Sequence, residues 1–256
     1  MKPITALMAL LLTGMAASGA SNSDFEIDLL RSGFVRGVQD HKCWNDFYVA
    51  EIVDGNLKAR SVGADIGQSR ITGEVRFSGK SVQYEARNDG EFGGKLEAVL
   101  KSGERRFMLK GNTQSFVPFE KDLYVFQGLS HLSMSTGSVS VIKDYDGRPQ
   151  PQDEPITFLP DTPVHAALAS KHRGLHWFWV VGTHSLVQVI TDWHLLQVVS
   201  WEEFSVREVA SFAEDDRGVV IGTCGGVIAV DVPCRRAPRT IDDRACPARF
   251  YVPKRT

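Results

Sequence analysis

The stretch Trp177 to Ile190 (WFWVVGTHSLVQVI) consists of an apolar run, a turn of small residues and a second alternating run. Four other stretches have the same form, over residues 47–60, 82–99, 123–142 and 219–232. The residues that precede each second run are Gly55, Gly94, Gly137, Ser185 and Gly226, and they lie 39, 43, 48 and 41 residues apart. Strand pairs that repeat at this period are typical of β-propeller blades. The sequence therefore predicts an all-β fold, namely a single β-propeller of five four-stranded blades.

The last two units show what a complete blade contains. In the fourth unit, strands are predicted over residues 164–170, 177–182, 186–190 and 195–200. The fifth unit lacks its fourth strand at the expected place, and either residues 249–252 or residues 25–30 could supply it. Pairing of the first and last segments would close the ring and remove exposed sheet edges. A β-sandwich is the alternative fold, because turns at a spacing of about 8 to 12 residues fit a sandwich as well.

The second and third units follow the same plan less clearly. Their inner strands are predicted at residues 73–77 and 115–119, and their outer strands at residues 105–109 and 156–159. Residues 143–154 (KDYDGRPQPQDE) are rich in turn-forming residues and predict a surface insertion.

The N-terminus has the features of a secretory signal peptide. Lys2 precedes an apolar run over residues 4–12, and the small residues Ser18, Gly19 and Ala20 suit cleavage after Ala20. An uncleaved anchor is the alternative, but the run is shorter than the ~20 apolar residues that span a membrane. We therefore expect residues 1–20 to be a signal peptide. Residues 21–256 would then form a single soluble β-propeller domain in the periplasm or outside the cell.

The charge balance is close to even, with 29 basic and 31 acidic residues. Cleavage would remove only Lys2 among the charged residues and would change the net charge from −2 to −3. This balance does not favour a nucleic-acid partner, and the locally basic stretch after Pro233 is explained by a solvated tail. The chain contains no Gly-x-Gly-x-x-Gly motif and no P-loop. No cofactor is predicted, and the partner is expected to be a small molecule, a glycan or a protein.

Four cysteines in an exported chain predict two disulfides, formed by Cys43, Cys224, Cys234 and Cys246. Cys224 precedes the predicted strand 227–232 and Cys234 follows it, which separates the two by roughly 20 Å at ~3.3 Å per residue. A disulfide needs its Cα atoms within ~7 Å. Two pairings remain open. In one, Cys43 pairs with Cys234 and Cys224 with Cys246; in the other, Cys43 pairs with Cys224 and Cys234 with Cys246.

A family resemblance adds to the fold prediction. Residues 209–232 (VASFAEDDRGVVIGTCGGVIAVDV) combine an acidic turn ending in Gly218 with a Gly-Thr-Cys-Gly-Gly turn between strands. This unit resembles the propeller repeats in the sensor domains of bacterial two-component regulators, and Val181-Gly182-Thr183 resembles them in part. Val219 and Val220 stand where that repeat usually has a tryptophan. The resemblance implies a propeller fold, but we expect no signalling role, since no signalling segment follows. Residues 88–94 and 128–132 also resemble segments of exported bacterial proteins, which implies no particular activity.

Turns between the second and third strands of propeller blades lie on one face near the central axis, where they bring distant residues together. They predict a polar ligand site made of Asn88, Asp89, Glu91, His131, Thr183, His184 and Thr223. The alternative is that the Asn-Asp-Gly and Gly-Thr sequences only satisfy hydrogen bonds within their turns. Glu91 is the residue that turn geometry explains least.

Catalytic and metal chemistry has less support in the sequence. Glycoside hydrolysis needs two carboxylates roughly 5 to 10 Å apart, and no other predicted turn supplies a partner for Glu91. His131, His184 and Glu91 lack the spacing of a zinc site, and residues 144–154 lack that of a calcium loop. No metal ligand and no catalytic residue is predicted.

The function predicted from the sequence is an exported, non-enzymatic binding module. It would recognise a small molecule, a glycan or a protein through the axial face of the propeller. Two alternatives remain, a carbohydrate-active hydrolase or lyase on a five-bladed propeller, and a structural or interaction protein of the cell envelope.

Overall fold

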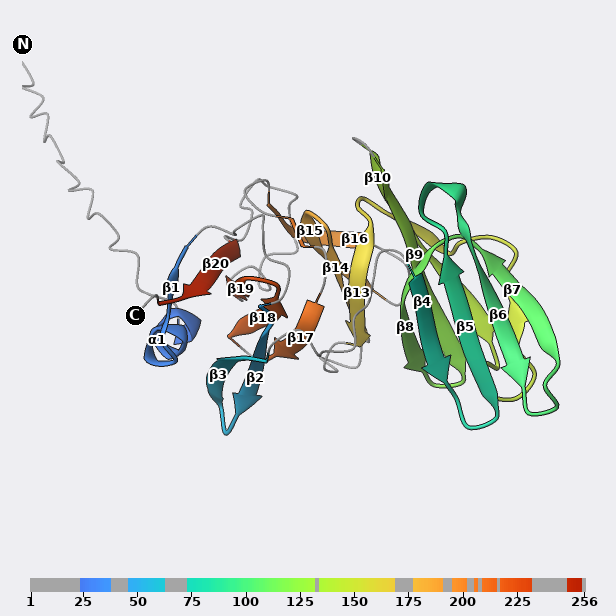
Figure 1. Ribbon diagram of the computed structural model, residues 1–256, viewed down its shortest axis with the longest axis horizontal. Coiled ribbons are helices and arrows are strands. Elements are labelled where there is room, and N and C mark those ends of the chain that lie inside the picture. The colour runs from blue at the N-terminus through green and yellow to red at the C-terminus, as the bar shows by residue number, and fades with distance from the viewer. Residues whose placement is uncertain are drawn as a thin grey trace, which may run out of the picture.

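The computed structural model describes residues 24–37, 46–62, 73–131, 134–168, 177–190, 195–201, 205–206, 209–215, 217–231 and 248–254. These residues form five antiparallel sheets. Figure 1 shows them spread along the long axis of the molecule, with the N-terminal and C-terminal sheets together at one end. Two short helices accompany them, α1 (Asp24–Arg31) and the single 3₁₀ turn η1 (Gly90–Phe92).

Each sheet is built from strands that are consecutive in the chain, apart from one added strand. The first sheet consists of β2 (Tyr48–Val53) and β3 (Asn56–Ser61). The second consists of β4 (Gly73–Ser78), β5 (Val82–Asn88), β6 (Gly94–Leu100) and β7 (Arg105–Lys110). The third consists of β8 (Thr113–Phe119), β9 (Asp122–His131), β10 (Met134–Lys143), β11 (Gln150–Pro151) and β12 (Thr157–Leu159).

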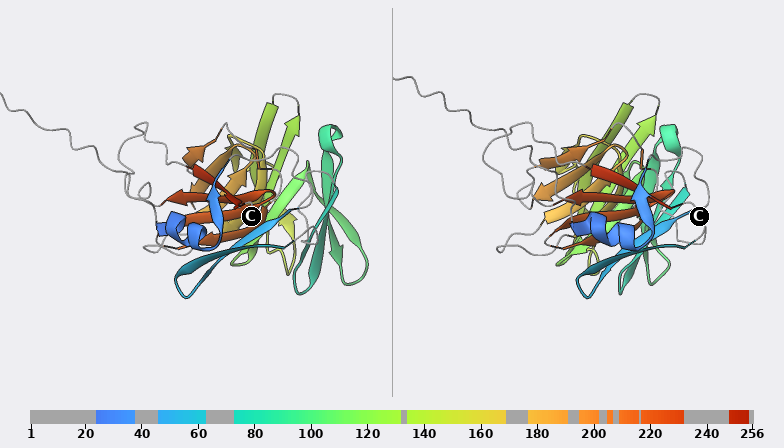
Figure 2. Two further views of the ribbon diagram at one scale, coloured as in Figure 1. Left: turned by 60° about the vertical axis from the view of Figure 1, so that its left-hand side comes forward. Right: turned by 90° about the vertical axis from the view of Figure 1, so that its left-hand side faces the viewer.

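The two C-terminal sheets complete the set. The fourth consists of β13 (Pro163–Leu168), β14 (Trp177–Gly182), β15 (Ser185–Ile190) and β16 (Leu195–Ser200). The fifth consists of β17 (Val209–Glu214), β18 (Gly218–Thr223), β19 (Gly226–Asp231) and β20 (Ala248–Pro253), and β1 (Phe34–Arg36) is added at its edge. Figure 2 shows the end of the molecule that carries α1, β1 and β20.

The sheets pack in the manner of propeller blades, through their first strands. β4 contacts β8, β8 contacts β13, β13 contacts β17, and β17 contacts β2. The N-terminal sheet therefore lies beside the C-terminal sheet. The predicted all-β fold is confirmed, and the arrangement of five sheets is propeller-like, unlike the two facing sheets of a sandwich.

Apolar side chains fill the spaces between neighbouring sheets. Trp177 and Trp179 of β14 are buried with Trp201 between the fourth and fifth sheets. Phe126 and Phe178 lie in the core between the third and fourth sheets. Further cores join the second sheet to the third, and the fifth sheet to the first and to α1. Burial of apolar surface between sheets is thus the main stabilising term of the fold.

The N-terminal segment 25–30 forms a helix, so its prediction as a strand is wrong. Phe25 and Leu29 are four residues apart and lie on one face of α1, where both are fully buried against the first and fifth sheets. The missing strand of the fifth sheet is β20, the other predicted segment, which pairs with β19. β1 pairs with β20, so the two ends of the chain do meet in one sheet.

The first sheet also differs from the prediction, because only two strands are described there and β2 takes the place of an innermost strand. The Ala50 N–H donates to Ser211 Oγ of the preceding sheet at 2.7 Å, just as the Ala166 N–H donates to Ser115 Oγ at 3.2 Å. β2 therefore corresponds to β13, which is the first strand of the fourth sheet. The turn at Gly55 thus joins the first strand of its sheet to the second. Its alignment with the turns between second and third strands is therefore wrong, and the described strands do not make a uniform set of five four-stranded blades.

Gly137 does not precede a strand as predicted, because it lies inside β10, opposite Gly128 of β9. Glycine is required at both positions by the close approach of the fourth sheet. A Cβ atom would lie 2.5 Å from Pro163 Cδ at Gly128 and 2.5 Å from the Asp161 carbonyl oxygen at Gly137.

The predicted insertion, residues 143–154, is tied into the structure at two points. β11 pairs with the end of β10. Asp146 Oδ1 accepts a hydrogen bond of 2.6 Å from the Ser81 N–H in the β4–β5 turn. Backbone hydrogen bonds from this turn, that of Ser81 foremost, lower the pKa of the Asp146 carboxyl. Asp146 therefore joins the third sheet to the second.

Candidate functional site

The β5–β6 turn carries Asn88, Asp89 and Glu91, three of the predicted ligand residues. Asn88 is buried, and its amide reaches across to the next sheet. Its Nδ2 donates to the Thr113 carbonyl oxygen at 2.6 Å, and its Oδ1 accepts from the Thr113 N–H at 2.8 Å. Both ends of the amide are used to join β5 to β8, so Asn88 is a structural residue and is not exposed to a ligand.

A second asparagine, Asn112, fixes the same turn from the neighbouring sheet. Its Nδ2 donates to the Gly90 carbonyl oxygen at 2.7 Å, and its Oδ1 accepts from the Asp89 N–H at 3.2 Å. The Asp89 carboxylate accepts a hydrogen bond of 2.8 Å from Arg87 Nε. The β5–β6 turn is therefore held in one conformation, and Glu91 lies exposed within it in η1.

Thr183 and His184 lie in the β14–β15 turn, beside the buried carboxylate of Asp161. Asp161 Oδ1 accepts from Thr183 Oγ1 at 2.6 Å and from the Thr162 N–H at 2.8 Å, and it also accepts a short hydrogen bond from Ser135 Oγ. Oδ2 accepts from the His184 N–H and from Ser185 Oγ. Five hydrogen bonds thus converge on this carboxylate from the third and fourth sheets.

The ionised form of Asp161 is favoured by its surroundings. Burial alone would raise the pKa of this carboxyl, but the hydrogen bonds from Ser135, Thr183, His184 and Thr162 outweigh it and hold the pKa below its usual value. The Thr183 hydroxyl is engaged in this cluster, whereas the His184 side chain is exposed. Asp161 therefore connects two sheets and orders the turn between β14 and β15.

Two predicted residues remain, Thr223 and His131. Thr223 Oγ1 is buried and donates to the carbonyl oxygens of Cys224 and Gly226 within its own turn. His131 ends β9, and its side chain lies outside the described part of the structure. The predicted residues thus lie in three strand-connecting turns and at the end of β9, and β9 contacts η1. Their hydrogen bonds match the alternative stated for these sequences, that they satisfy turns and join strands.

Three residues that fix the β5–β6 and β14–β15 turns were not predicted: Asn112, Ser135 and Asp161. A sequence pattern could have pointed to two of them. Asn112-Thr113 and Asp161-Thr162 both occur where the chain enters the first strand of a new sheet. A short polar side chain at such a position is suited to bond nearby backbone groups.

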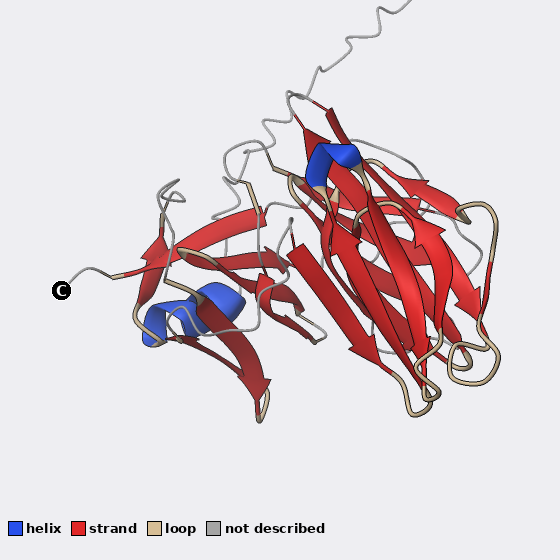
Figure 3. Cartoon of the chain, turned by 45° about the vertical axis from the view of Figure 1, so that its right-hand side comes forward, coloured by secondary structure: helices blue, strands red, loops and turns tan. Residues whose placement is uncertain are grey.

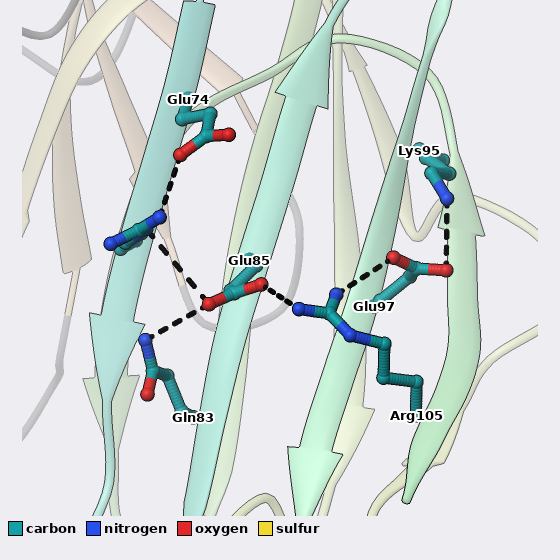
Figure 4. A network of polar contacts seen from close by, with 7 residues as sticks. Glu74, Gln83, Glu85, Lys95, Glu97 and Arg105 are labelled. Carbon is teal, nitrogen blue, oxygen red and sulfur yellow. Dashed lines mark hydrogen bonds and ion pairs between the residues drawn. The ribbon is translucent and has the colours of Figure 1, made fainter. Parts of the chain in front are cut away.

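The outer face of the second sheet carries a network of ion pairs (Figure 4). Glu85 accepts from Arg105 Nη2 at 2.6 Å and from Gln83 Nε2 at 3.2 Å. Arg105 also bonds Glu97 at 3.2 Å, and Glu97 accepts from Lys95 Nζ at 3.0 Å. Exposed pairs of this kind contribute roughly 0 to 1 kcal/mol each. We interpret the network as a solvated sheet face whose charges are matched.

Grouped metal ligands and membrane-spanning helices are both absent from the residues that the structure describes. Within those ranges, no three His, Cys, Asp or Glu side chains are grouped as a metal site would require. Neither α1 nor η1, the helices found there, is long and apolar enough to cross a membrane.

Comparison with known proteins gives little further information. No protein-family model matches the chain, and no curated protein matches it. One similar solved structure is the computationally designed Ika8 protein, with 10% identity and a TM-score of 0.36 over 70% of this chain and 55% of that one. Another is Drosophila Semaphorin 1a, extracellular domains 1-2, with 11% identity and a TM-score of 0.41 over 82% of this chain and 66% of that one. The chain thus spans about two thirds or less of either structure, and such distant similarities carry no functional argument.

Proposed function

We propose that this chain is an exported, non-enzymatic binding module that recognises a protein partner through the face carrying the β5–β6 and β14–β15 turns. One observation carries the proposal. The polar side chains of Asn88, Asn112 and Asp161 on this face are already engaged in hydrogen bonds that join neighbouring sheets. Groups that are saturated in this way offer little to a small polar ligand, whereas the rigid surface that they create suits a macromolecule.

An enzymatic role for this face is less well supported. A general acid in glycoside hydrolysis needs a carboxyl whose pKa is raised. The hydrogen bonds on Asp161 lower its pKa, and both carboxylate oxygens already have partners. The buried carboxylate of this face is therefore a stabilising group and a poor proton donor.

Export is part of the proposal and rests on the sequence alone. A signal peptide over residues 1–20 and cleavage near Ala20 would release residues 21–256 as one propeller domain into the periplasm or the extracellular space.

The proposed disulfides are Cys43–Cys224 and Cys234–Cys246. Cys224 is disulfide-bonded, and the other three cysteines lie outside the described residues. Cys224 forms a β-bridge with Phe47, only four residues from Cys43. Cys246 precedes Ala248 by two residues, and Ala248 pairs with Val230 at the end of β19 remote from Cys224. The strand register therefore favours this pairing over Cys224–Cys246, since disulfide Cα atoms lie within ~7 Å.

Thermal unfolding of the mature, oxidised protein tests the class of ligand. We expect no sugar, divalent metal or exported metabolite to raise Tm, and we expect a purified protein partner to raise it by mass action. A ligand at ~100 times its Kd adds about 2.7 kcal/mol to the free energy of unfolding, so a small-molecule site would be evident. A clear rise with one small molecule that disappears in Glu91→Gln would overturn the proposal in favour of the predicted polar site.

A further inference from the structure

The first sheet ends at β3, which is an edge strand in the described part of the structure. β2 and β3 are joined by the two-residue turn Asp54-Gly55, in which both residues have positive φ values, 53° and 73°. The tip of this hairpin projects away from the other sheets (Figure 3). Within the described ranges the first sheet has two strands, whereas every other sheet has at least four. β3 therefore lies where the other sheets continue with a third strand.

The strand register fixes which backbone groups of β3 face outward. In an antiparallel pair, hydrogen-bonded and non-hydrogen-bonded residue pairs alternate along the strands. The Val62 N–H donates to the Phe47 carbonyl oxygen at 2.9 Å, so every second residue back from Val62 also bonds β2. The N–H and C=O groups of Leu57, Ala59 and Ser61 therefore point away from β2.

The first of these three positions is capped by α1. Asp28 Oδ2 accepts a hydrogen bond of 3.0 Å from the Leu57 N–H and another of 2.9 Å from Arg217 Nη1, which holds the carboxylate in place. The Ala59 and Ser61 N–H groups donate to no residue that the structure describes. Unpaired N–H and C=O groups on a strand edge are a template for a further strand. The edge at Ala59 and Ser61 is therefore open to β-strand addition.

The side chains of β3 determine which strand can be added. Lys58 and Arg60 are exposed on one face of the hairpin, and Glu51 of β2 is opposite Lys58. Arg60 lies 4.0 Å from Glu51, and Lys58 forms no ion pair with a described residue. The two strands thus carry two cations against one carboxylate, while Asp54 lies at the tip of the hairpin. The outer edge of β3 has a net positive charge.

A second copy of β3 does not fit this edge. Antiparallel pairing of two β3 strands about Ala59 would place Lys58 of each copy opposite Arg60 of the other, and like charges directly opposite destabilise a sheet. Lysine on an edge strand is a known protection against such self-pairing. A strand with acidic side chains at these two positions would form opposite-charge pairs instead. The charge of β3 therefore selects a foreign, acidic strand.

We propose that the outer edge of β3 binds an extended acidic segment of another protein by β-strand addition. Acidic side chains of that segment lie opposite Lys58 and Arg60, in the non-hydrogen-bonded pairs where side chains are closest. Apolar side chains lie opposite Ala59, on the face that Leu57 buries against the fifth sheet. The edge uses no residue of the β5–β6 and β14–β15 turns, so this inference goes beyond the proposed function and is tested separately from it.

Fluorescence anisotropy with synthetic peptides tests the proposal on the mature protein. The acidic probe is Thr-Glu-Val-Glu-Val-Glu-Thr, and the basic control has lysine in place of each glutamate. We expect the acidic peptide to bind at least about tenfold more tightly than the basic one. N-methylation of the valines removes the N–H groups that would face β3 and should abolish binding. N-methylation of the glutamates, whose N–H groups would face away from β3, should preserve it.

Two charge variants test the contact with Lys58. We expect Lys58→Glu to weaken binding of the acidic peptide at least about tenfold and to strengthen binding of the basic one. Lys101→Glu is the matched control, because Lys101 is exposed between β6 and β7. It should leave the Kd of the acidic peptide unchanged within about twofold. Equal Tm values would show that both variants are folded.

Hydrogen exchange, followed residue by residue with NMR, locates the bound peptide. In the free protein, the Ala59 and Ser61 amides should exchange at least about tenfold faster than those of Lys58 and Arg60, which bond β2. The acidic peptide should slow the exchange of Ala59 and Ser61 at least about tenfold.

Several results would overturn the inference. Equal binding of the acidic and basic peptides, or no binding of the acidic one, would show that the edge does not select an acidic strand. Equal binding of the two N-methylated peptides would exclude strand pairing. Slow exchange of Ala59 and Ser61 in the free protein would show that the edge is covered by the chain itself, or by a second copy if the protection rises with protein concentration. None of these results decides the role of the turn face.

Discussion

Protonation of His165 should weaken the packing between the fourth and fifth sheets. His165 lies on β13, with its ring 6.2 Å from that of Phe212 on β17. Burial lowers the pKa of this imidazole from 6.5 to about 4. The position is equivalent to Ser115 and Ser211, each of which accepts a backbone hydrogen bond from the next sheet. Acidification therefore places a positive charge on His165, at the contact between β13 and β17 where the equivalent positions of other sheets hold neutral serines.

The sign and size of the effect follow from this shift. A basic group whose pKa is lower in the folded state contributes stability that is present above pH 6.5 and is lost as pH falls toward 4. From the two pKa values, the free energy of unfolding should fall by about 2 kcal/mol between pH 7 and pH 5, and by about 3 kcal/mol below pH 4.

Urea unfolding at pH 7 and pH 5 measures this loss in wild type and in His165→Gln. The variant has no titrating group at this position, so its loss between the two pH values should be smaller by about 2 kcal/mol. Asp161 and the other carboxylates are present in both proteins, and their acid response cancels in the comparison. An equal loss in both proteins would refute the reasoning, because the surroundings of the half-buried His165 would then not keep its imidazole neutral.

Two other predictions concern the joints between sheets and the ends of the chain. Asp161→Ala leaves hydrogen-bond donors from Ser135, Thr183 and His184 without their acceptor, and we expect it to lower the free energy of unfolding by at least about 3 kcal/mol. Urea unfolding checks this, and a loss below about 1 kcal/mol would show that the cluster contributes little. For the disulfides, non-reducing peptide mapping should find Cys43 linked to Cys224 and Cys234 linked to Cys246. A peptide linking Cys224 to Cys246 would contradict the register of β19 and β20.

The alternating and apolar segments were sufficient to predict most of the strands. β14 and β16 have the predicted bounds, and β4, β7 and β12 differ from theirs by one residue. Segment 25–30 was ambiguous because Phe25 and Leu29 fit a helix face, while its apolar content also fits a strand. The packing of sheets, which the sequence pattern does not contain, decided the outcome there.

The candidate site could be predicted only in part, since each turn is completed by residues from another segment. Asn88 and Asp89 are recognisable as turn residues, but their partners Thr113 and Asn112 begin the next sheet. Asp161 is likewise separated by 26 residues from Ser135. A polar residue in a turn looks the same in the sequence whether it faces a ligand or a neighbouring strand. Only the three-dimensional contacts distinguish the two.

The central claim is that polar side chains of the turn face hold neighbouring sheets together, and the free energy of unfolding of Asn88→Ala tests it most directly. The substitution leaves the buried N–H and C=O groups of Thr113 without Asn88, which should cost roughly 2 to 4 kcal/mol. Asn56→Ala is the matched control, because Asn56 is exposed and makes one local hydrogen bond to Asp54. Its loss should stay below about 0.5 kcal/mol. If Asn88→Ala is as stable as this control, the turn residues are not structural and the predicted polar ligand site regains its place.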